Sequence, residues 1–117
     1  MSEQQKEKTL HLLDQALRFA RARLSADITA QRLLILISVY FNEGLSQREL
    51  LRHLDSTSIT ALSRNLADLS ALTTKKQPGP GLLELRIDPL NLRVRRVFLT
   101  KKGRQFMKQW IRAAAKG

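Results

Sequence analysis

The stretch Ser46–Leu72 constrains the fold most, because two amphipathic helical patterns meet there across a short polar break. Ser46 and Glu49 have the Ser-x-x-Glu spacing of a capping box, in which each side chain satisfies a free N–H at a helix start. The apolar side of this first helix consists of Leu50, Leu51 and Leu54. Residues 55–58 (Asp-Ser-Thr-Ser) compete with the backbone for hydrogen bonds and therefore favour a turn and a helix N-cap.

The second helix of this stretch is predicted to have one buried face and one polar face. Its apolar residues recur at spacings of three and four, which predicts a single buried stripe of Ile59, Leu62, Leu66 and Leu69. The opposite face is small, polar and basic, with Thr57, Thr60, Ala61 and Arg64. A helix that lies in the major groove of DNA needs such a face. The stretch is therefore predicted to be a helix-turn-helix.

The charge balance favours an anionic partner. The chain has 21 Lys and Arg against 10 Asp and Glu, a formal net charge of +11. Nucleic acid is the commonest partner of a small domain this basic. The alternatives are a soluble protein that is merely basic, or a ribosome-associated one. The sequence has no cysteine, which excludes disulfides and thiolate metal sites, and His11 and His53 lie far apart, so we expect no metal and no cofactor.

Length and hydropathy predict one domain, residues 1–117, in the cytoplasm. A chain of 117 residues has the size of a single domain. The N-terminus is polar and mixed in charge, unlike a signal peptide. The longest apolar run, residues 33–41, is too short to span a bilayer, so we expect no membrane partner.

Two helices are expected before Ser46. In residues 10–24 the apolar residues alternate at spacings of three and four, which predicts a helix with one narrow apolar seam. The seam consists of Leu10, Leu13, Leu17, Ala20 and Leu24. Such a seam suits a partner helix, either the C-terminal helix of this chain or a second subunit. Thr29 is expected to cap the next helix, which runs to Gly44. Its run 33–37 is rich in β-branched residues, like a strand, but the Thr start and Gly stop favour a central core helix.

A β-hairpin and a last helix are expected after Leu72. Two Pro-Gly pairs make residues 73–81 a loop. Leu83, Leu85 and Ile87 alternate with charged residues, which predicts a half-buried strand over residues 82–87. After a turn at 88–92, residues 93–99 form the second strand, with Val97 and Leu99 on one face. Thr100 then caps a helix over 101–115 with the apolar face Phe106, Met107, Trp110, Ile111 and Ala114. A helix-turn-helix followed by a hairpin predicts a mainly α, winged-helix fold.

Basic residues concentrate in the hairpin and the last helix. From Arg86 to the end, Asp88 is the only acid, whereas the second strand alone carries Arg93, Arg95 and Arg96. Such a surface binds phosphates by releasing their counterions, and arginine suits a narrow minor groove. We therefore expect the second strand to contact DNA. The alternative is a solvated basic face that keeps the protein soluble.

The helix-turn-helix supplies further candidate contacts. Arg64 is predicted to contact a base, because a guanidinium bonds guanine in a bidentate manner. The alternative is an ordinary helix-surface pair with Asp68, four residues on. Hydroxyls near the helix N-terminus are predicted to hold a phosphate, or simply to cap the helix: Thr57, Ser58 and Thr60. Gln47 and Arg48 are predicted to touch backbone phosphates.

No pattern of an enzyme is present. The carboxylates show no pairing that suggests acid–base work, and the PGPG segment lacks the Lys-Ser/Thr ending of a phosphate-binding loop. No nucleophile lies in a recognisable elbow. Tyr40 and Trp110 lie within apolar stripes, so we expect both in the core. The chain is expected not to be an enzyme.

The run from Ile28 to Lys102 resembles the MarR-type winged-helix regulators. The similarity lies in SQRELLRHL, ALSRNLADL and DPLNLRVRRVFLTKKGR, and the LT-x-KGR ending is its most specific part. The resemblance implies base contacts around Thr60, Ser63, Arg64 and Asn65, and a minor-groove contact by Arg93. In the family an Asp two residues before that arginine braces the wing, whereas this chain has Asn91.

The resemblance also implies a homodimer, because the family dimerises through its terminal helices. These are residues 10–24 and 101–115, with the candidate contacts Leu10, Leu13, Leu17, Leu24, Phe106, Trp110 and Ile111. Many relatives have further C-terminal helices, so we expect a smaller interface here and predict no small-molecule effector.

The expected function is a sequence-specific transcriptional regulator that binds double-stranded DNA, a dimeric repressor on an inverted repeat. One alternative is a winged-helix protein of replication, partition or DNA architecture with low sequence specificity. The other is a protein-interaction adaptor.

Overall fold

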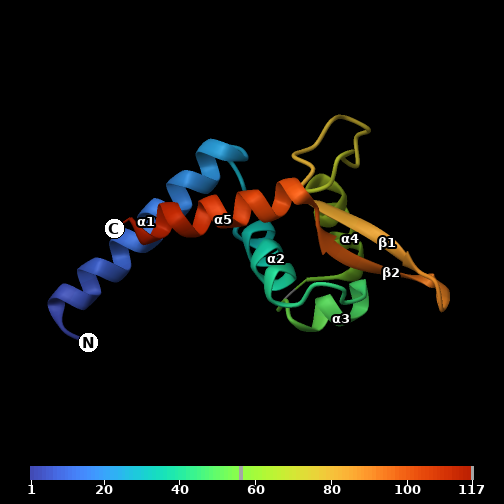
Figure 1. The fold of residues 1–117 in the computed structure, drawn as a ribbon, viewed down its shortest axis with the longest axis horizontal. Coiled ribbons are helices and arrows are strands. Elements are labelled where there is room, and N and C mark those ends of the chain that lie inside the picture. Colours follow the sequence, from blue (N-terminus) through green and yellow to red (C-terminus); the bar gives the residue numbers. More distant parts are fainter. Residues whose placement is uncertain (56, 117) are drawn as a thin grey trace.

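The computed structural model describes residues 1–55 and 57–116, which form five helices and one antiparallel hairpin (Figure 1). In chain order the elements are α1 (Glu3–Arg23), α2 (Ala30–Phe41), α3 (Gln47–Arg52), α4 (Ile59–Asp68), β1 (Leu83–Asp88), β2 (Asn91–Leu99) and α5 (Lys101–Ala115). The predicted element order of a winged helix is confirmed. Ser56, in the predicted turn of the helix-turn-helix, lies outside the described residues.

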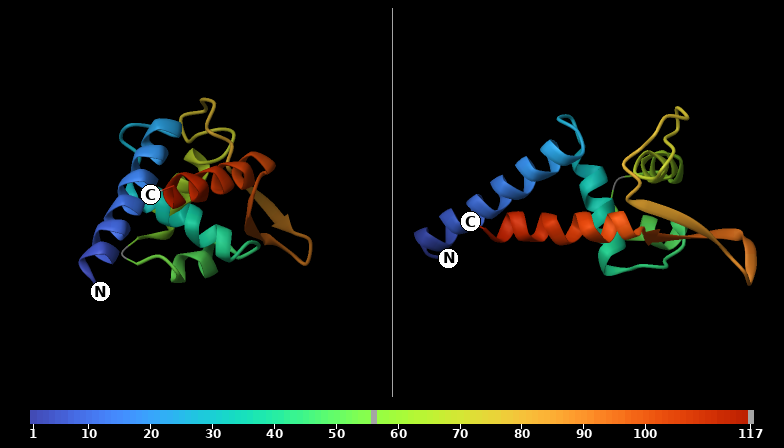
Figure 2. Two further views of the ribbon diagram at one scale, coloured as in Figure 1. Left: turned by 60° about the vertical axis from the view of Figure 1, so that its left-hand side comes forward. Right: turned by 45° about the horizontal axis from the view of Figure 1, so that its top comes forward.

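The molecule is elongated, with principal extents of 52 × 30 × 25 Å. The hairpin projects from one end, beside α3 and α4, while α1 and the C-terminal part of α5 project from the other (Figures 1 and 2). The chain therefore separates a compact winged unit from a pair of protruding terminal helices. None of the helices in the described ranges is long and apolar enough to cross a membrane.

Helix starts are fixed by local capping. At the start of each helix, the side-chain oxygen of a Ser or Thr accepts a backbone N–H of the first turn. The capping residues are Ser2, Thr29, Ser46, Ser58 and Thr100. The predicted capping box is present, since Ser46 Oγ accepts the Glu49 N–H at 3.1 Å and Glu49 Oε1 accepts the Ser46 N–H at 3.1 Å. Each such cap stabilises its helix by about 1 kcal/mol.

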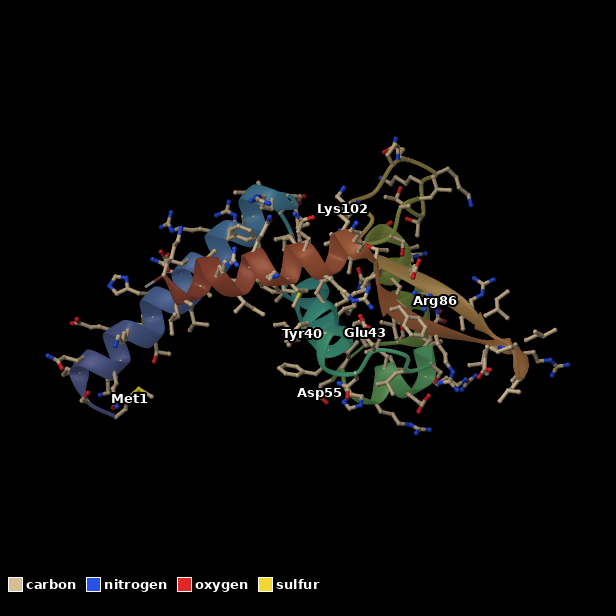
Figure 3. The ribbon with its side chains drawn as sticks, viewed as in Figure 1. Met1, Tyr40, Glu43, Asp55, Arg86 and Lys102 are labelled. Carbon is tan, nitrogen blue, oxygen red and sulfur yellow. The ribbon has the colours of Figure 1, made fainter. Side chains whose placement is uncertain are left out.

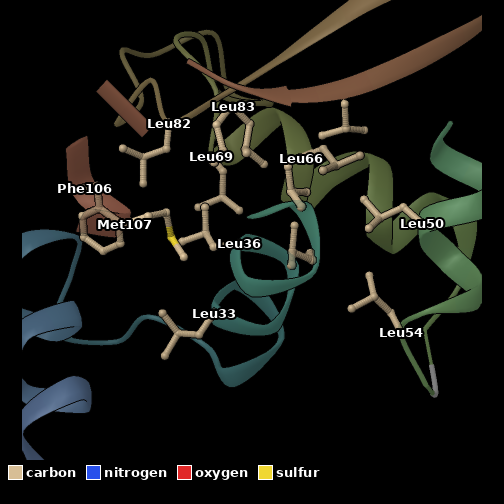
Figure 4. Close-up of a cluster of buried hydrophobic side chains, with 14 of the residues drawn as sticks. Leu33, Leu36, Leu50, Leu54, Leu66, Leu69, Leu82, Leu83, Phe106 and Met107 are labelled. Carbon is tan, nitrogen blue, oxygen red and sulfur yellow. The ribbon is translucent and has the colours of Figure 1, made fainter. Parts of the chain in front are cut away.

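One hydrophobic core joins the helices to the base of the hairpin (Figure 4). Its buried side chains come from α2 (Leu33, Ile35, Leu36 and Val39), from α3 and α4 (Leu50, Leu62 and Leu66), from the hairpin (Leu83, Val97 and Leu99) and from α5 (Phe106, Met107 and Trp110). The predictions that Val97 and Leu99 share a buried face and that Trp110 belongs to the core are confirmed.

Three expectations about burial are wrong. The helix α2 exists, but it is buried on one face only, and Tyr40 on its other side is 45% exposed. Ile59 is 40% exposed because it is the first residue of α4, and that helix ends at Asp68 rather than Leu72. Ile87 is 57% exposed because it lies near the tip of the hairpin.

The hairpin is tied to the helical unit at its base. Its register pairs Leu83 with Leu99 and Leu85 with Val97. The Val97 N–H donates to the Leu45 carbonyl at 2.9 Å, and the Gly44 N–H donates to the Val97 carbonyl at 2.9 Å. Residues 44–46 thus run along β2, and they connect the hairpin to the start of α3.

The start of α5 touches the chain just before β1. The Gly103 N–H donates to Thr100 Oγ1 at 2.9 Å. A Cβ on Gly103 would lie 2.0 Å from the Leu82 carbonyl oxygen, far inside any normal contact. The glycine of the LTKKGR segment therefore permits a close approach of α5 to the residue that precedes β1.

Candidate nucleic-acid interface

The face of α4 that points away from the core is polar. Leu62 and Leu66 are buried, whereas Thr60, Ser63 and Arg64 are exposed. The cap at Ser58 fixes the direction in which these side chains leave the helix, because its Oγ accepts the Ala61 N–H at 3.1 Å. The predicted separation of a buried stripe and an outward polar face is present over this part of α4.

Arg64 does not pair with Asp68, so that alternative is wrong. One carboxylate oxygen of Asp68 accepts from the Arg32 guanidinium at 2.8 Å. The other accepts from the Thr74 N–H at 2.9 Å and the Thr74 hydroxyl at 3.0 Å. These contacts, with the Thr74 N–H the largest cause, hold the pKa of Asp68 below its usual range. Within the described residues no ion pair engages Arg64, which leaves its guanidinium free for an external partner.

Asn65 is oriented toward α2 rather than outward. Its Oδ1 accepts from Arg32 Nε at 3.1 Å, so its amide oxygen is already engaged. Arg32 thereby binds two residues of α4 and fixes that helix against α2. Sequence reasoning missed Arg32, because its partners lie 33 and 36 residues away and no local pattern reports them.

Two of the three predicted hairpin arginines, Arg93 and Arg95, are exposed, and no ion pair involves them in the part of the chain that the structure describes. Arg86, on the other strand, pairs with Glu84 and stacks over the Phe98 ring at 4.1 Å from its centroid. Figure 3 shows nitrogen-bearing side chains standing out from the hairpin, with Arg86 labelled near its middle.

Arg96 braces the hairpin, so the guanidinium of this predicted DNA contact is already engaged within the chain. Its guanidinium contacts Asp88 Oδ2 at 3.0 Å, the Gly44 carbonyl at 2.9 Å and Glu49 Oε1 at 3.4 Å. The brace that the family resemblance places at residue 91 is therefore supplied by Asp88. Asn91 instead accepts the backbone N–H of Arg93 at 3.2 Å.

The two carboxylates around Arg96 stay ionised to low pH. The pKa of Asp88 is lowered first by the Leu90 N–H and then by the Arg96 guanidinium. The pKa of Glu49 is lowered mainly by the N–H and hydroxyl of Ser46. Because both carboxylates remain charged, Arg96 is largely neutralised, and the free cations of the hairpin are those nearer its tip.

The remaining predicted contacts flank this surface. Arg48 is exposed in the first turn of α3, and Gln47 is half-buried beside it. Thr57 is half-buried just before α4, and the Ser58 oxygen is occupied by the cap. Over the described residues no group of three His, Cys, Asp or Glu side chains is arranged to hold a metal ion.

The predicted dimerisation residues divide into a buried, a half-buried and an exposed set. Phe106 and Trp110 are buried within the chain, and Trp110 Nε1 donates to the Ala16 carbonyl of α1 at 2.8 Å. Leu24 is half-buried. The exposed set, with exposed fractions of 49–66%, consists of Leu10, Leu13, Leu17 and Ile111. Beside it lies an apolar groove of about 230 Å³, lined by Ala16, Ile37, Tyr40, Phe41, Met107, Trp110, Ile111 and Ala114.

A helix-turn-helix, a hairpin wing and paired terminal helices define a winged helix-turn-helix fold. Among solved structures the chain is similar to S. aureus MepR in a DNA complex, with a TM-score of 0.71 and 18% identity over 98% of this chain and 85% of MepR. It is also similar to a mutant of E. coli MarR in complex with operator DNA, with a TM-score of 0.64 and 23% identity over 96% and 69% of the two chains. A third match is the repressor CouR bound to a 23-mer duplex, with a TM-score of 0.66 and 20% identity over 94% and 69%.

The resemblance to MarR-type proteins predicted from the sequence is thus confirmed as a likeness of fold. No protein-family model matches the sequence, and no curated protein matches it either.

Proposed function

We propose that the protein is a transcriptional regulator that binds double-stranded DNA as a homodimer. It represses transcription by binding to an inverted repeat. The observation that carries the proposal is the outward face of α4. It presents Thr60, Ser63 and Arg64 to solvent, and no ion pair engages that arginine within residues 1–55 and 57–116. The wing of the same unit adds Arg93 and Arg95. The DNA complexes of MepR, MarR and CouR support this interpretation, because these proteins share the fold.

In the proposed complex α4 enters the major groove and Arg64 bonds a guanine edge. The wing lies along the minor groove, where Arg93 meets the concentrated negative potential. Phosphate contacts that set the register come from Arg95, Arg48, Gln47, Thr57 and Ser58. In a two-fold dimer the two α4 helices then reach half-sites about one helical turn apart, roughly 34 Å.

The proposed dimer forms through the protruding terminal helices. Leu10, Leu13, Leu17 and Ile111 are exposed in the single chain, and water-exposed leucines at helical spacing favour association. Full burial of one such side chain contributes about 1.5–3 kcal/mol, before the entropic cost of association. The adjoining groove along α2 and α5 extends the apolar surface.

The test of this proposal compares Arg64→Ala with Arg112→Ala, which removes an exposed arginine from α5 instead. Duplexes are first selected from a random pool with the wild-type protein. Arg64→Ala should then lose about 1–3 kcal/mol of binding free energy on the selected site and tolerate substitutions at one base position. Arg112→Ala should keep both affinity and specificity. Equal losses of Arg64→Ala on selected and scrambled DNA would refute the base contact.

A second candidate function is a winged-helix protein of low specificity that acts in replication, partition or DNA architecture. The net charge of +11 favours it, because phosphate contacts alone support strong binding at low salt. Selection from the random pool separates the two functions. A pool that stays random while binding remains strong indicates the second function, and a protein that binds no duplex at low salt is instead an interaction adaptor.

A further inference from the structure

The tip of the wing, residues 87–92, is unexpectedly apolar. Leu90 is 95% exposed, Leu92 is 76% exposed and Ile87 is 57% exposed, and Pro89 is also exposed. Single exposed leucines are ordinary, but these residues lie together at the end of the hairpin farthest from α1 (Figure 1). The core does not reach this end of the hairpin, so the tip contributes little to folding.

The tip is nevertheless held in one conformation. Asp88 Oδ1 accepts the Leu90 N–H at 2.9 Å, and Asn91 Oδ1 accepts the Arg93 N–H at 3.2 Å. The other oxygen of Asp88 is bound by Arg96, whose guanidinium also donates to the Gly44 carbonyl. This chain of bonds connects the apolar tip to the helical body, so that little ordering remains to be done on binding.

Positive charge follows the apolar tip along β2. Arg95 lies opposite Ile87 in the register of the hairpin, and Arg93 follows Leu92 directly. Both arginines are exposed, and the described residues offer them no carboxylate partner. An apolar end beside two cations suits the minor groove of DNA, where apolar sugar walls lie next to anionic phosphates.

We propose that the wing tip is an apolar wedge that enters the minor groove and bends the DNA. Leu90 and Leu92 pack on deoxyribose and partly unstack one base step, while Arg93 and Arg95 bind phosphates beside them. Apolar side chains of this kind kink duplexes when they insert from the minor groove. The inference rests on the proposed DNA binding and adds a distinct contact, a distinct energetic component and a deformation of the DNA.

The experiment uses the double variant Leu90→Ser, Leu92→Ser. Its matched control is Leu34→Ser, Leu72→Ser, which removes two leucines that are 51% and 53% exposed and lie outside the wing. The probe is a short mixed-sequence duplex with a donor and an acceptor dye at its ends. Affinity is measured across a series of salt concentrations, and the end-to-end distance is measured at saturation. Thermal unfolding and sedimentation verify that both variants fold and associate like the wild type.

The wing variant should bind about tenfold to a hundredfold more weakly at every salt concentration, because it loses apolar burial. Its salt dependence should stay unchanged, because it neutralises the same phosphates. The saturated DNA should be straighter than with the wild type. The control variant should match the wild type in all three measurements.

Two results would overturn the inference and leave the proposed function standing. One is a wing variant that binds and bends DNA like the wild type. The other is a wing variant with a changed sedimentation coefficient and unchanged DNA affinity, since the tip would then contact a second copy of the chain. If the wild-type protein bound no duplex at low salt, the proposed function would fail and the wedge with it.

Discussion

Replacing Gly103 by alanine tests the contact on which the placement of α5 depends. The added Cβ would lie 2.0 Å from the Leu82 carbonyl oxygen, and side chains essentially never approach below 3.0 Å. The start of α5 and the backbone at Leu82 must therefore separate by about an ångström, which strains the packing of Phe106, Met107 and Trp110. Overpacking of this kind costs about 1–3 kcal/mol. The obstacle here is a backbone atom, so we expect the cost of Gly103→Ala to lie at the upper end of this range.

The gain in helix propensity from glycine to alanine offsets about 1 kcal/mol of that cost. The net loss in the free energy of unfolding is then about 2 kcal/mol, which lowers the melting temperature by about 8 °C for a chain of this size. Calorimetry at a fixed protein concentration measures this shift in melting temperature. The control is Lys102→Ala at the exposed neighbouring residue, whose stability should stay within about 0.5 kcal/mol of the wild type. A Gly103→Ala protein as stable as the wild type would refute the close approach.

Three further predictions concern charge and assembly. Arg93→Ala and Arg95→Ala should each reduce the slope of log K against log salt by about 1 on any duplex, and an unchanged slope would exclude the wing from the DNA. Leu13→Asp should convert the proposed dimer to a monomer in sedimentation, and an unchanged species would place the interface elsewhere. Because the pKa of Asp68 is lower in the folded protein, its carboxylate stabilises the fold at pH values above the unfolded-state pKa of about 3.9. This stabilisation is lost as the pH falls through the folded-state pKa. Asp68→Asn should therefore be less stable than the wild type at pH 7 in denaturant titrations, with the difference shrinking toward pH 3, whereas a constant difference would contradict the ionic role.

The elements that were predictable from the sequence are those whose signals lie within a few residues. The capping box of Ser46 and Glu49, the Thr29 and Thr100 caps and the alternating strands depend on local chemistry, and all are present. The order of these elements then sufficed to predict a winged helix. Burial at the ends of elements was less predictable, since Ile59 and Ile87 continue an apolar pattern beyond the reach of the core.

The orientation of the candidate site residues was predictable only where a side chain has no tertiary partner. Arg64 and Arg93 point to solvent as expected, because helix periodicity and hairpin position determine their directions. Arg96 and Asn65 have the same local pattern, yet they bind Gly44 and Arg32, 52 and 33 residues away. Such pairings depend on how the elements pack, so a sequence pattern does not distinguish a bracing arginine from one that is free to bind DNA.

The most direct test of the regulatory proposal is binding to the DNA just upstream of the coding sequence of this protein. A duplex from that region is compared with a scrambled duplex of equal length near physiological salt, because small regulators often control their own expression. We predict clear preference for the upstream duplex, and loss of that preference in Arg64→Ala. Equal, salt-sensitive binding to both duplexes, with no change in Arg64→Ala, would contradict sequence-specific regulation from this site.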